Sequence, residues 1–313
     1  MPFTAKSGKF NASINTVEFG TGDKAVKIGG ENVFPLYSFD AAIENAPKVG
    51  IEITDFGMEH EPECIKKYYE GCATLADMAR KAASMEGVDF LSFRMEGGDP
   101  NGANKSTEEL IGELKEIADA VDLPLVVCGC KNVEKDAELF SKAAEALNGK
   151  NAVILSAKEE NYKTVGAAAG LAYKQVVGAE SAVDINLAKQ LNVLISQLGV
   201  DSKSVVMNVG TAAVGYGFEY VISTMDRVKA AALGQADAQL QMPIITPVAD
   251  EAWNVKEAMA SEADMPEWGS QEERGIDMEV ETAAAVLASG SNAVILKHPT
   301  SVATISKLIK ALV

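Results

Sequence analysis

Short apolar runs alternate with segments of helical periodicity from residue 49 to the end of the chain. The eight runs cover residues 49–54, 88–95, 125–128, 152–155, 182–185, 205–207, 243–246 and 293–296. Runs of this kind are typical of parallel strands that are buried on both faces. Because eight successive strand–helix units specify a closed barrel, we predict an α/β protein with the (β/α)8 TIM-barrel fold. An open doubly wound sheet usually contains fewer units and is the weaker alternative.

The N-terminal part of the chain departs from this pattern. Residues 17–19 and 25–28 are apolar runs on either side of the turn sequence GTGDK, which predicts a β-hairpin. The glycine spacing also resembles a dinucleotide-binding fingerprint, but no helical pattern follows it, so we interpret it as a turn. We therefore divide the chain into an N-terminal hairpin and linker over residues 1–47 and a barrel over residues 48–313. We expect the hairpin to close one end of the barrel.

The net charge and the hydrophobicity of the chain limit which classes of partner and which cellular location we expect. The net charge is −17 at pH 7 over 313 residues. Nucleic acids and anionic membrane surfaces attract basic proteins, so we expect neither as a partner. No apolar run reaches the length of about 18 residues that spans a bilayer, and residues 1–10 lack the apolar core of a secretory signal. We therefore expect a cytoplasmic protein.

The chain has four cysteines, Cys64, Cys72, Cys128 and Cys130. A disulfide framework is uncommon in a cytoplasmic protein of this size. The spacings C-x7-C and C-x-C match neither zinc nor iron–sulfur patterns, so we predict no metal ligands. Cys128 and Cys130 as a soft metal pair stay an alternative, but two small hydrophobic residues at a strand end are the preferred interpretation.

The active sites of barrel proteins lie at the carboxyl ends of the strands, which defines a set of candidate residues. These are Asp55, Arg94, Glu96, Cys130, Lys131, Ser156, Lys158, Asp184, Asn186, Asn208, Thr246, Asp250, Lys297 and His298. The loops over residues 97–102 and 210–217 are rich in small residues. Loops of this kind leave room for a large, flat ligand, because glycine lets the backbone approach a ring closely.

Several of these candidates have a structural alternative. Glu52 and Arg94 can form a buried ion pair between neighbouring strands, which explains them as well as catalysis does. Asn186 precedes a helix, so capping is its default role. Asn208 can satisfy backbone groups of the following loop. That loop lacks the G-K-[ST] ending of a P-loop, which gives phosphate binding weak support.

Both tryptophans, Trp253 and Trp268, fall between the seventh strand and its helix, in a segment over residues 248–275. The segment is too long for an ordinary connection in a barrel. Tryptophan anchors are typical of protein interfaces. A helical insertion that packs on its own barrel is an equal alternative.

Four segments together resemble a known family. They are the N-terminal hairpin, MEGGDPNG at residues 95–102, LVVCGC at 125–130 and VMNVGTAAVGYG at 206–217. They are similar to the small subunits of corrinoid iron–sulfur proteins, a family that includes the delta subunits of acetyl-CoA decarbonylase/synthase. The resemblance covers essentially the whole chain.

The resemblance implies a TIM barrel related to methyltetrahydrofolate-dependent methyltransferases. Such a barrel pairs with a large subunit that holds a [4Fe-4S] cluster and a corrinoid (cobalamin), and the top of the barrel caps the corrinoid. Methyltetrahydrofolate supplies a methyl group through a separate methyltransferase, and acetyl-CoA synthase receives it, as part of the anaerobic Wood–Ljungdahl pathway of carbon fixation. The sequence contains no Asp-x-His-x-x-Gly motif, so we do not expect this chain to ligate the cobalt.

We therefore expect a non-catalytic carrier subunit with no catalytic and no metal-binding residues of its own. Our hypothesis from the glycine-rich mouth and its neutral donors is that Asp184, Asn208, Gly210, Thr211, Gly215 and Tyr216 bind the cofactor. In the related methyltransferases, Asp and Asn residues at strand ends hold the pterin, and Asp184 and Asn208 are the matching candidates here. The alternative is therefore a pterin-dependent methyltransferase that acts directly on methyltetrahydrofolate. A metal-dependent lyase is a third and weaker possibility.

Overall fold

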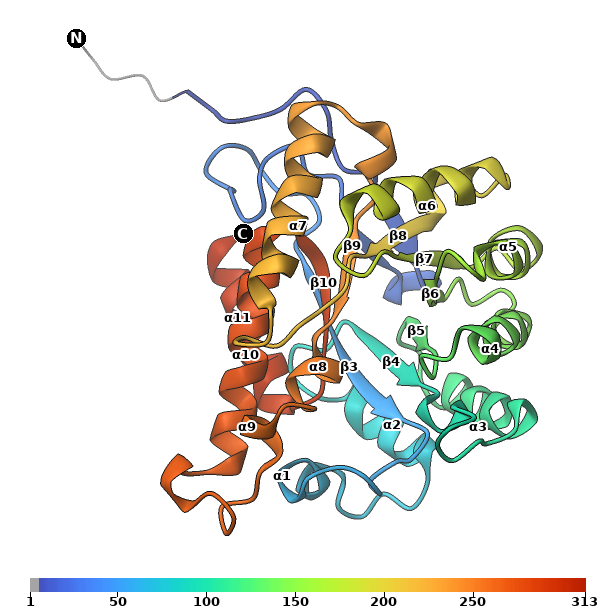
Figure 1. The fold of residues 1–313 in the computed structure, drawn as a ribbon, viewed down its shortest axis with the longest axis vertical. Coiled ribbons are helices and arrows are strands. Elements are labelled where there is room, and N and C mark those ends of the chain that lie inside the picture. Colours follow the sequence, from blue (N-terminus) through green and yellow to red (C-terminus); the bar gives the residue numbers. More distant parts are fainter. Residues whose placement is uncertain (1–5) are drawn as a thin grey trace.

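The computed structural model describes residues 6–313 and contains a closed barrel of eight parallel strands (Figure 1). The strands follow one another around the barrel in sequence order, and β10 closes the ring between β9 and β3. They are β3 (Lys48–Thr54), β4 (Phe90–Arg94), β5 (Leu125–Cys128), β6 (Val153–Ala157), β7 (Val176–Glu180), β8 (Val205–Asn208), β9 (Ile244–Pro247) and β10 (Ser291–Leu296). The predicted TIM-barrel fold is confirmed.

Helices cover the outside of the barrel. They are α1 (Glu63–Lys66), α2 (Leu75–Ala83), α3 (Thr107–Ala120), α4 (Val133–Ala146), α5 (Tyr162–Val165), α6 (Ile185–Gln197), α7 (Phe218–Lys229), α8 (Val248–Ala252), α9 (Lys256–Met259), α10 (Gln271–Ser289) and α11 (Pro299–Leu312). Side-chain caps fix several helix starts: the hydroxyl of Ser106, for example, accepts a hydrogen bond from the Glu109 backbone N–H at the start of α3. No helix within residues 6–313 is long and apolar enough to cross a membrane.

The fifth barrel strand lies earlier in the chain than the sequence pattern predicts. We predicted a strand over residues 182–185 after a helix that reaches residue 176, and this prediction was wrong. The helical segment that starts with α5 ends at Ala172, and β7 starts at Val176. Ala182 and Val183 have φ values of +45° and +67°, a left-handed conformation that cannot continue a strand.

The N-terminal hairpin closes one end of the barrel, as predicted. It consists of β1 (Val17–Phe19) and β2 (Val26–Ile28), which pair antiparallel. Its apolar side chains are buried with the residues that fill the barrel interior, and the rings of Phe19 and Phe90 meet edge to face with centroids 5.5 Å apart. The hairpin and the barrel therefore share one core.

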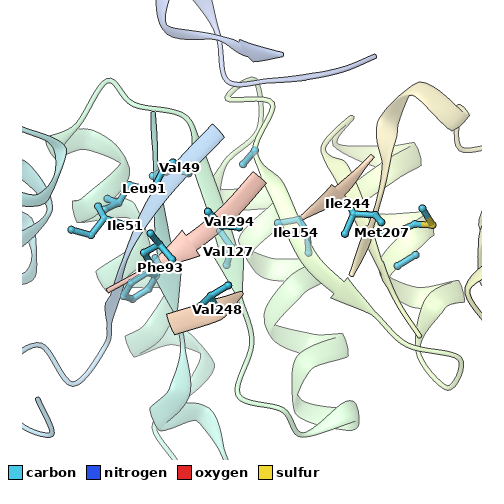
Figure 2. Close-up of a cluster of buried hydrophobic side chains, with 14 of the residues drawn as sticks. Val49, Ile51, Leu91, Phe93, Val127, Ile154, Met207, Ile244, Val248 and Val294 are labelled. Carbon is cyan, nitrogen blue, oxygen red and sulfur yellow. The ribbon is translucent and has the colours of Figure 1, made fainter. Parts of the chain in front are cut away.

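A second buried cluster fills the space between the strands and the surrounding helices. Figure 2 shows Val49, Ile51, Leu91 and Phe93 in this cluster, on neighbouring strands β3 and β4. These side chains alternate along each strand with the side chains that point into the barrel. Removing a side chain of this size from water stabilises the fold by about 1.5–3 kcal/mol.

The barrel interior changes from apolar to polar along the strand direction. On β4, Phe90 is followed on the same face by Ser92 and then by Arg94; on β8, Val206 is followed by Asn208. The apolar end meets the hairpin. The polar end is the carboxyl end of the strands, where the site of a TIM barrel lies.

The segment between β9 and α10 is a helical insertion that packs on its own barrel. Trp253 is 2% exposed, and its ring stacks on that of His298 with centroids 5.9 Å apart. Trp268 is half-buried beside Lys256 and Arg274, whose cationic groups lie 5.1 and 5.6 Å from its ring. For Trp253 the structural alternative is correct, whereas an interface role for Trp268 stays a prediction.

Candidate functional site

A cavity of about 290 Å³ opens at the carboxyl ends of the strands. Its residues come from β4 to β9 and from the loops and helices that follow β5 to β9. The polar residues that line it are Arg94, Lys131, Asp136, Ser156, Lys158, Glu180, Asn208, Thr211, Asp250 and Glu251. Six of these residues are among the candidates that the strand-end rule singled out from the sequence.

Asn208, the last residue of β8, is held in a fixed orientation. Its Nδ2 donates to Ser156 Oγ at 3.1 Å, and its Oδ1 accepts from the Gly210 backbone N–H at 3.1 Å. The side chain is buried, with 6% of the residue exposed. An amide has two N–H donors, and these contacts use only one of them. Asn208 therefore both satisfies loop backbone, as the structural alternative proposed, and keeps a donor in the cavity wall.

Sequence reasoning missed three acidic residues of the lining, Asp136, Glu180 and Glu251, and Glu180 is the one that ends a barrel strand. It is the last residue of β7 and lies opposite Asn208 in the register of the two parallel strands, so the two side chains stand next to each other in the cavity wall. Its Oε1 lies 3.2 Å from the Lys158 Nζ. The misplaced fifth strand hid this residue, because the strand-end rule was applied to residues 182–185.

The opposite wall carries a network of ion pairs. Arg94 Nη2 lies 3.0 Å from Glu52 Oε2, and Arg94 Nη1 lies 3.4 Å from Asp250 Oδ2. Lys131 Nζ is 2.8 Å from the same Asp250 oxygen. Burial alone would raise the pKa of Asp250, but Arg94 and Lys131 outweigh it and hold that pKa below its usual value. The predicted buried pair of Glu52 and Arg94 is confirmed, and the cations of this wall are already neutralised by the protein.

Other strand-end candidates serve the structure. Asp55 accepts a hydrogen bond from the Gly97 backbone N–H at 2.9 Å and lies 3.0 Å from Lys105 Nζ. Lys297 pairs with Glu61 at 2.9 Å. Thr246 shares a hydrogen bond with Ser291, and Cys130 donates its backbone N–H to Asp136. Glu96 is exposed beyond the end of β4 and does not line the cavity.

His298 caps α11 and does not face the cavity. Its Nδ1 accepts from the Thr300 backbone N–H at 3.0 Å, and the residue has no exposed surface. Burial lowers the pKa of His298 to about 4, although the nearby Glu272 carboxylate opposes this effect. The imidazole is therefore neutral at physiological pH and occupied by its capping bond.

The residues with expected cofactor-binding roles divide into two groups. Asn208, Gly210 and Thr211 line the cavity. Gly215 and Tyr216 lie outside it on the exposed rim, where the Tyr216 hydroxyl donates to Glu257 Oε2 at 2.6 Å. Their roles stay predictions.

Asp184 is exposed and does not itself line the cavity, although its neighbour Val183 does. It caps α6: its Oδ1 accepts hydrogen bonds from the backbone N–H groups of Asn186 and Leu187 at 2.7 and 3.2 Å. The helix cap is therefore Asp184, and the prediction that Asn186 caps was wrong. A pterin-holding role for Asp184 stays a prediction, but Glu180 is the stronger acidic candidate, because it lines the cavity and the Asp184 carboxylate is used as a helix cap.

The four cysteines are free thiols, and burial raises the pKa of three of them, Cys64, Cys128 and Cys130. Burial raises the pKa of Cys128, which lines the cavity, to about 12, and it raises that of Cys130 to about 12 as well. Within residues 6–313, no group of three or more histidine, cysteine, aspartate or glutamate side chains is arranged to hold a metal ion. The structure thus favours the interpretation of Cys128 and Cys130 as small buried hydrophobic residues.

Solved structures with a similar fold include dihydropteroate synthases. The enzyme from Thermus thermophilus in complex with 4-aminobenzoate has a TM-score of 0.54 at 13% identity, and the match covers 95% of this chain and all of that one. The enzyme from Xanthomonas albilineans in complex with 7,8-dihydropteroate has a TM-score of 0.52 at 13% identity, over 85% of this chain and 94% of that one. At this identity the likeness concerns the fold alone.

Relatives found by sequence similarity show the family to which the chain belongs. Subunit delta 1 of the acetyl-CoA decarbonylase/synthase complex of Methanosarcina thermophila is 30% identical over 94% of this chain and 67% of its own length. The delta subunit of Methanothermobacter thermautotrophicus is 32% identical over 94% of this chain and 74% of its own length. This chain thus spans about two thirds to three quarters of these relatives. The family model for the CO dehydrogenase/acetyl-CoA synthase delta subunit matches residues 16–300. The chain belongs to this delta subunit family.

Proposed function

We propose that this chain is the small subunit of a heterodimeric methyl-group carrier, and that the top of its barrel caps a corrinoid held by a large subunit. The large subunit also holds the [4Fe-4S] cluster. The corrinoid accepts a methyl group from methyltetrahydrofolate through a separate methyltransferase and passes it to acetyl-CoA synthase. Relatives named as subunits of the acetyl-CoA decarbonylase/synthase complex support this assignment.

The observation that carries the proposal is the shape and chemistry of the barrel mouth. Pockets that enclose a drug-sized ligand have volumes of about 300–1,000 Å³. At about 290 Å³ the cavity lies below this range, so a corrin macrocycle would rest across the mouth rather than enter it. The rim at Gly215 is exposed and has no side chain to obstruct a flat ring.

Neutral hydrogen-bond donors face this mouth. Asn208 keeps one N–H that its protein contacts do not use. The Thr211 hydroxyl is buried in the cavity lining and has no hydrogen-bond partner among residues 6–313. A buried hydroxyl without a partner is costly, so a ligand amide would stabilise it. These residues would hold the amide side chains of the corrinoid, whose cobalt carries the methyl group.

The side chains around the mouth also fit a subunit that does not itself catalyse methyl transfer. Cys128 is protonated at neutral pH because burial raises its pKa to about 12, so it is a poor nucleophile. His298 is buried as a helix cap. Arg94 and Lys131 are neutralised by Glu52 and Asp250. A positioned acid or base for methyl transfer would have to come from Glu180, Asp136 or Glu251.

A methyl-transfer assay tests whether the subunit is catalytic. The purified chain is mixed with methyltetrahydrofolate and free Co(I) corrinoid, and the formation of methyl-Co(III) is followed by visible absorption. The proposal predicts no rate above that of the mixture without protein. A rate that depends on protein concentration would contradict the carrier role and favour the second candidate.

The second candidate is a pterin-dependent methyltransferase, and the cavity itself favours it. A volume of about 290 Å³ is sufficient for a bicyclic ring, and Glu180 beside Asn208 offers a carboxylate acceptor next to an amide. A carboxylate can accept two N–H bonds from the amino-pyrimidine edge of a pterin. Calorimetric titration with methyltetrahydrofolate distinguishes the two candidates: binding that Glu180→Gln abolishes and Glu159→Gln preserves would support the pterin site.

A further inference from the structure

The large apolar side chains that are exposed within residues 6–313 form two separate groups. Tyr216, Tyr220 and Met259 belong to the rim of the barrel mouth and its neighbouring helices. The other five are Phe34, Tyr37, Phe39, Leu312 and Val313, and we call them the aromatic patch. Phe39 is the most exposed of all, at 78%.

The aromatic patch is continuous. The ring centroids of Phe34 and Tyr37 are 6.1 Å apart, and those of Tyr37 and Phe39 are 4.8 Å apart. The Ser38 hydroxyl donates to the backbone carbonyl of Leu312 at 2.6 Å, which places the end of α11 beside the aromatic rings. Exposed apolar residues are normal when they are scattered singly, whereas a contiguous patch indicates an interaction site.

The patch lies at the end of the barrel opposite to the mouth. Helix α11 begins at the carboxyl end of β10 and runs back along the barrel, so its last turn reaches the end where the strands begin. Lys310 and Lys48, the first residue of β3, both act electrostatically on Asp89, which agrees with this placement. Figure 1 shows the C terminus beside the blue loop of the N-terminal extension. The patch is therefore independent of the cavity.

The charge around the patch differs from that of the whole protein. Residues 6–10, 34–40 and 308–313 carry three lysines, Lys6, Lys9 and Lys310, and one acidic residue, Asp40. The chain as a whole has a net charge of −17. A partner that fits this surface has an apolar groove bordered by carboxylates. A symmetric contact between the patches of two copies of this chain does not fit, because it would bring like charges together.

We propose that the aromatic patch is a permanent docking surface for the large subunit, separate from the corrinoid-capping mouth. This inference rests on the proposed function for the identity of the partner. A corrinoid that is capped by the barrel has to be uncovered when the methyl group is exchanged, so contacts at the mouth break in each cycle. An anchor at the opposite end keeps the two chains together during this step, because the mouth contact then re-forms within one complex at high effective concentration.

Photo-crosslinking in the co-expressed complex tests the location of the anchor. The variant Phe39→p-benzoylphenylalanine is expected to crosslink to the large subunit on illumination. The matched control places the same residue at Lys115, an exposed position on the outer face of α3. A crosslink at position 39 to a second copy of this chain, or no crosslink to the large subunit, would overturn the inference.

Affinity measurements provide the second readout. The double variant Tyr37→Ser/Phe39→Ser is expected to weaken binding of the large subunit at least tenfold, whereas the corrinoid spectrum of the complex formed at saturating concentrations stays unchanged. Lys6→Glu/Lys9→Glu is expected to weaken binding in low salt and to reduce its salt dependence, while Lys115→Glu changes neither. These side chains are exposed, so the thermal unfolding midpoint should not move.

Each failure has a distinct meaning. If the large subunit binds the wild-type chain and both double variants equally, the aromatic patch is not the docking surface, and the proposed carrier function is unaffected. If the large subunit does not bind the wild-type chain, the anchor and the proposed function fail together. If the double variants lose affinity and the corrinoid spectrum at once, the patch is not separate from the mouth and the inference is overturned.

Discussion

Asn208 and Ser156 are joined by a hydrogen bond of 3.1 Å although they stand on strands that do not pair with each other. Asn208 ends β8, Ser156 belongs to β6, and β7 lies between them. The bond therefore crosses the barrel interior at the level of the cavity and fixes the amide before any ligand binds. A preorganised donor of this kind is what a binding site requires.

Replacing Asn208 tests its contribution to the stability of the fold and to the retention of the corrinoid. Asn208→Ala removes the hydrogen bonds to Ser156 and Gly210 and is expected to destabilise the fold by about 1–3 kcal/mol. In the complex it should also weaken the retention of corrinoid, measured as corrinoid released during gel filtration. Asn186→Ala is the matched control, because the Asn186 side chain is exposed and the Asp184 cap bonds only its backbone.

The same variant distinguishes the two functions. If the chain is a pterin-dependent methyltransferase, Asn208→Ala should reduce turnover roughly ten- to a thousandfold through lost transition-state hydrogen bonding. The carrier account predicts no turnover by the wild-type chain, so under that account Asn208→Ala causes no change in this assay. A measurable wild-type rate that falls in Asn208→Ala would support the enzyme.

The buried ion pair is expected to make a large contribution to stability. Arg94→Met leaves Glu52 buried without its cation, whereas Asp250 keeps Lys131, and it should lower the free energy of unfolding by about 3–5 kcal/mol. Glu52→Gln in the same chain should restore part of this loss, because it removes the unpaired charge. Urea denaturation measures both effects. Lys142→Ala, at an exposed pair with Glu145, should leave the midpoint unchanged.

His298 predicts a specific loss of stability in acid. Burial lowers its pKa to about 4 in the folded protein, whereas an unfolded histidine titrates near 6.5. The unfolded chain therefore gains a proton first as the pH falls. The contribution is complete above about pH 6.5 and decreases by roughly 3 kcal/mol as the pH falls to about 4. His298→Asn keeps a capping side chain and should flatten this part of the unfolding free energy against pH. An equally steep profile in the variant would show that other groups cause it.

Thiol labelling tests the burial of the cysteines. Cys128 and Cys130 have pKa values of about 12, and Cys64 is buried with a raised pKa. Only Cys72 is partly exposed. Iodoacetamide at pH 8 is therefore expected to modify Cys72 alone in the native protein and all four cysteines in urea, as measured by mass spectrometry. Rapid native labelling of Cys128 would contradict the closed cavity wall.

The barrel was predictable because its strands are apolar runs with clear helical segments between them. The fifth unit was not, for a local reason. Residues 166–172 form a helix of wide turns in a run of alanine and glycine, which hides the end of the helix in the sequence. The backbone then turns at Lys174, with φ +54°, before β7. A short Val176–Val177 run was available as a signal for the strand, but helical periodicity across the alanines outweighed it.

This shift hid Glu180, whereas Asp136 and Glu251 were missed because they lie in α4 and α8, beyond the strand ends that the rule considers. Asn208, Ser156 and Lys158 were found because their strands were placed correctly. Glu180 was missed and Asp184 was favoured because the fifth strand end was placed a few residues too late. The aromatic patch was not predictable either, because the proximity of residues 34–39 to the end of α11 depends on how the two ends of the chain pack.

The most direct measurement is the visible absorption spectrum after anaerobic purification of this chain expressed alone and with its presumed large subunit. The carrier account predicts a corrinoid band only in the co-purified complex, with both chains present in equal amounts. Corrinoid or methyltetrahydrofolate bound to this chain alone would contradict the account and favour the methyltransferase. A stable chain that binds neither ligand and no large subunit would contradict both.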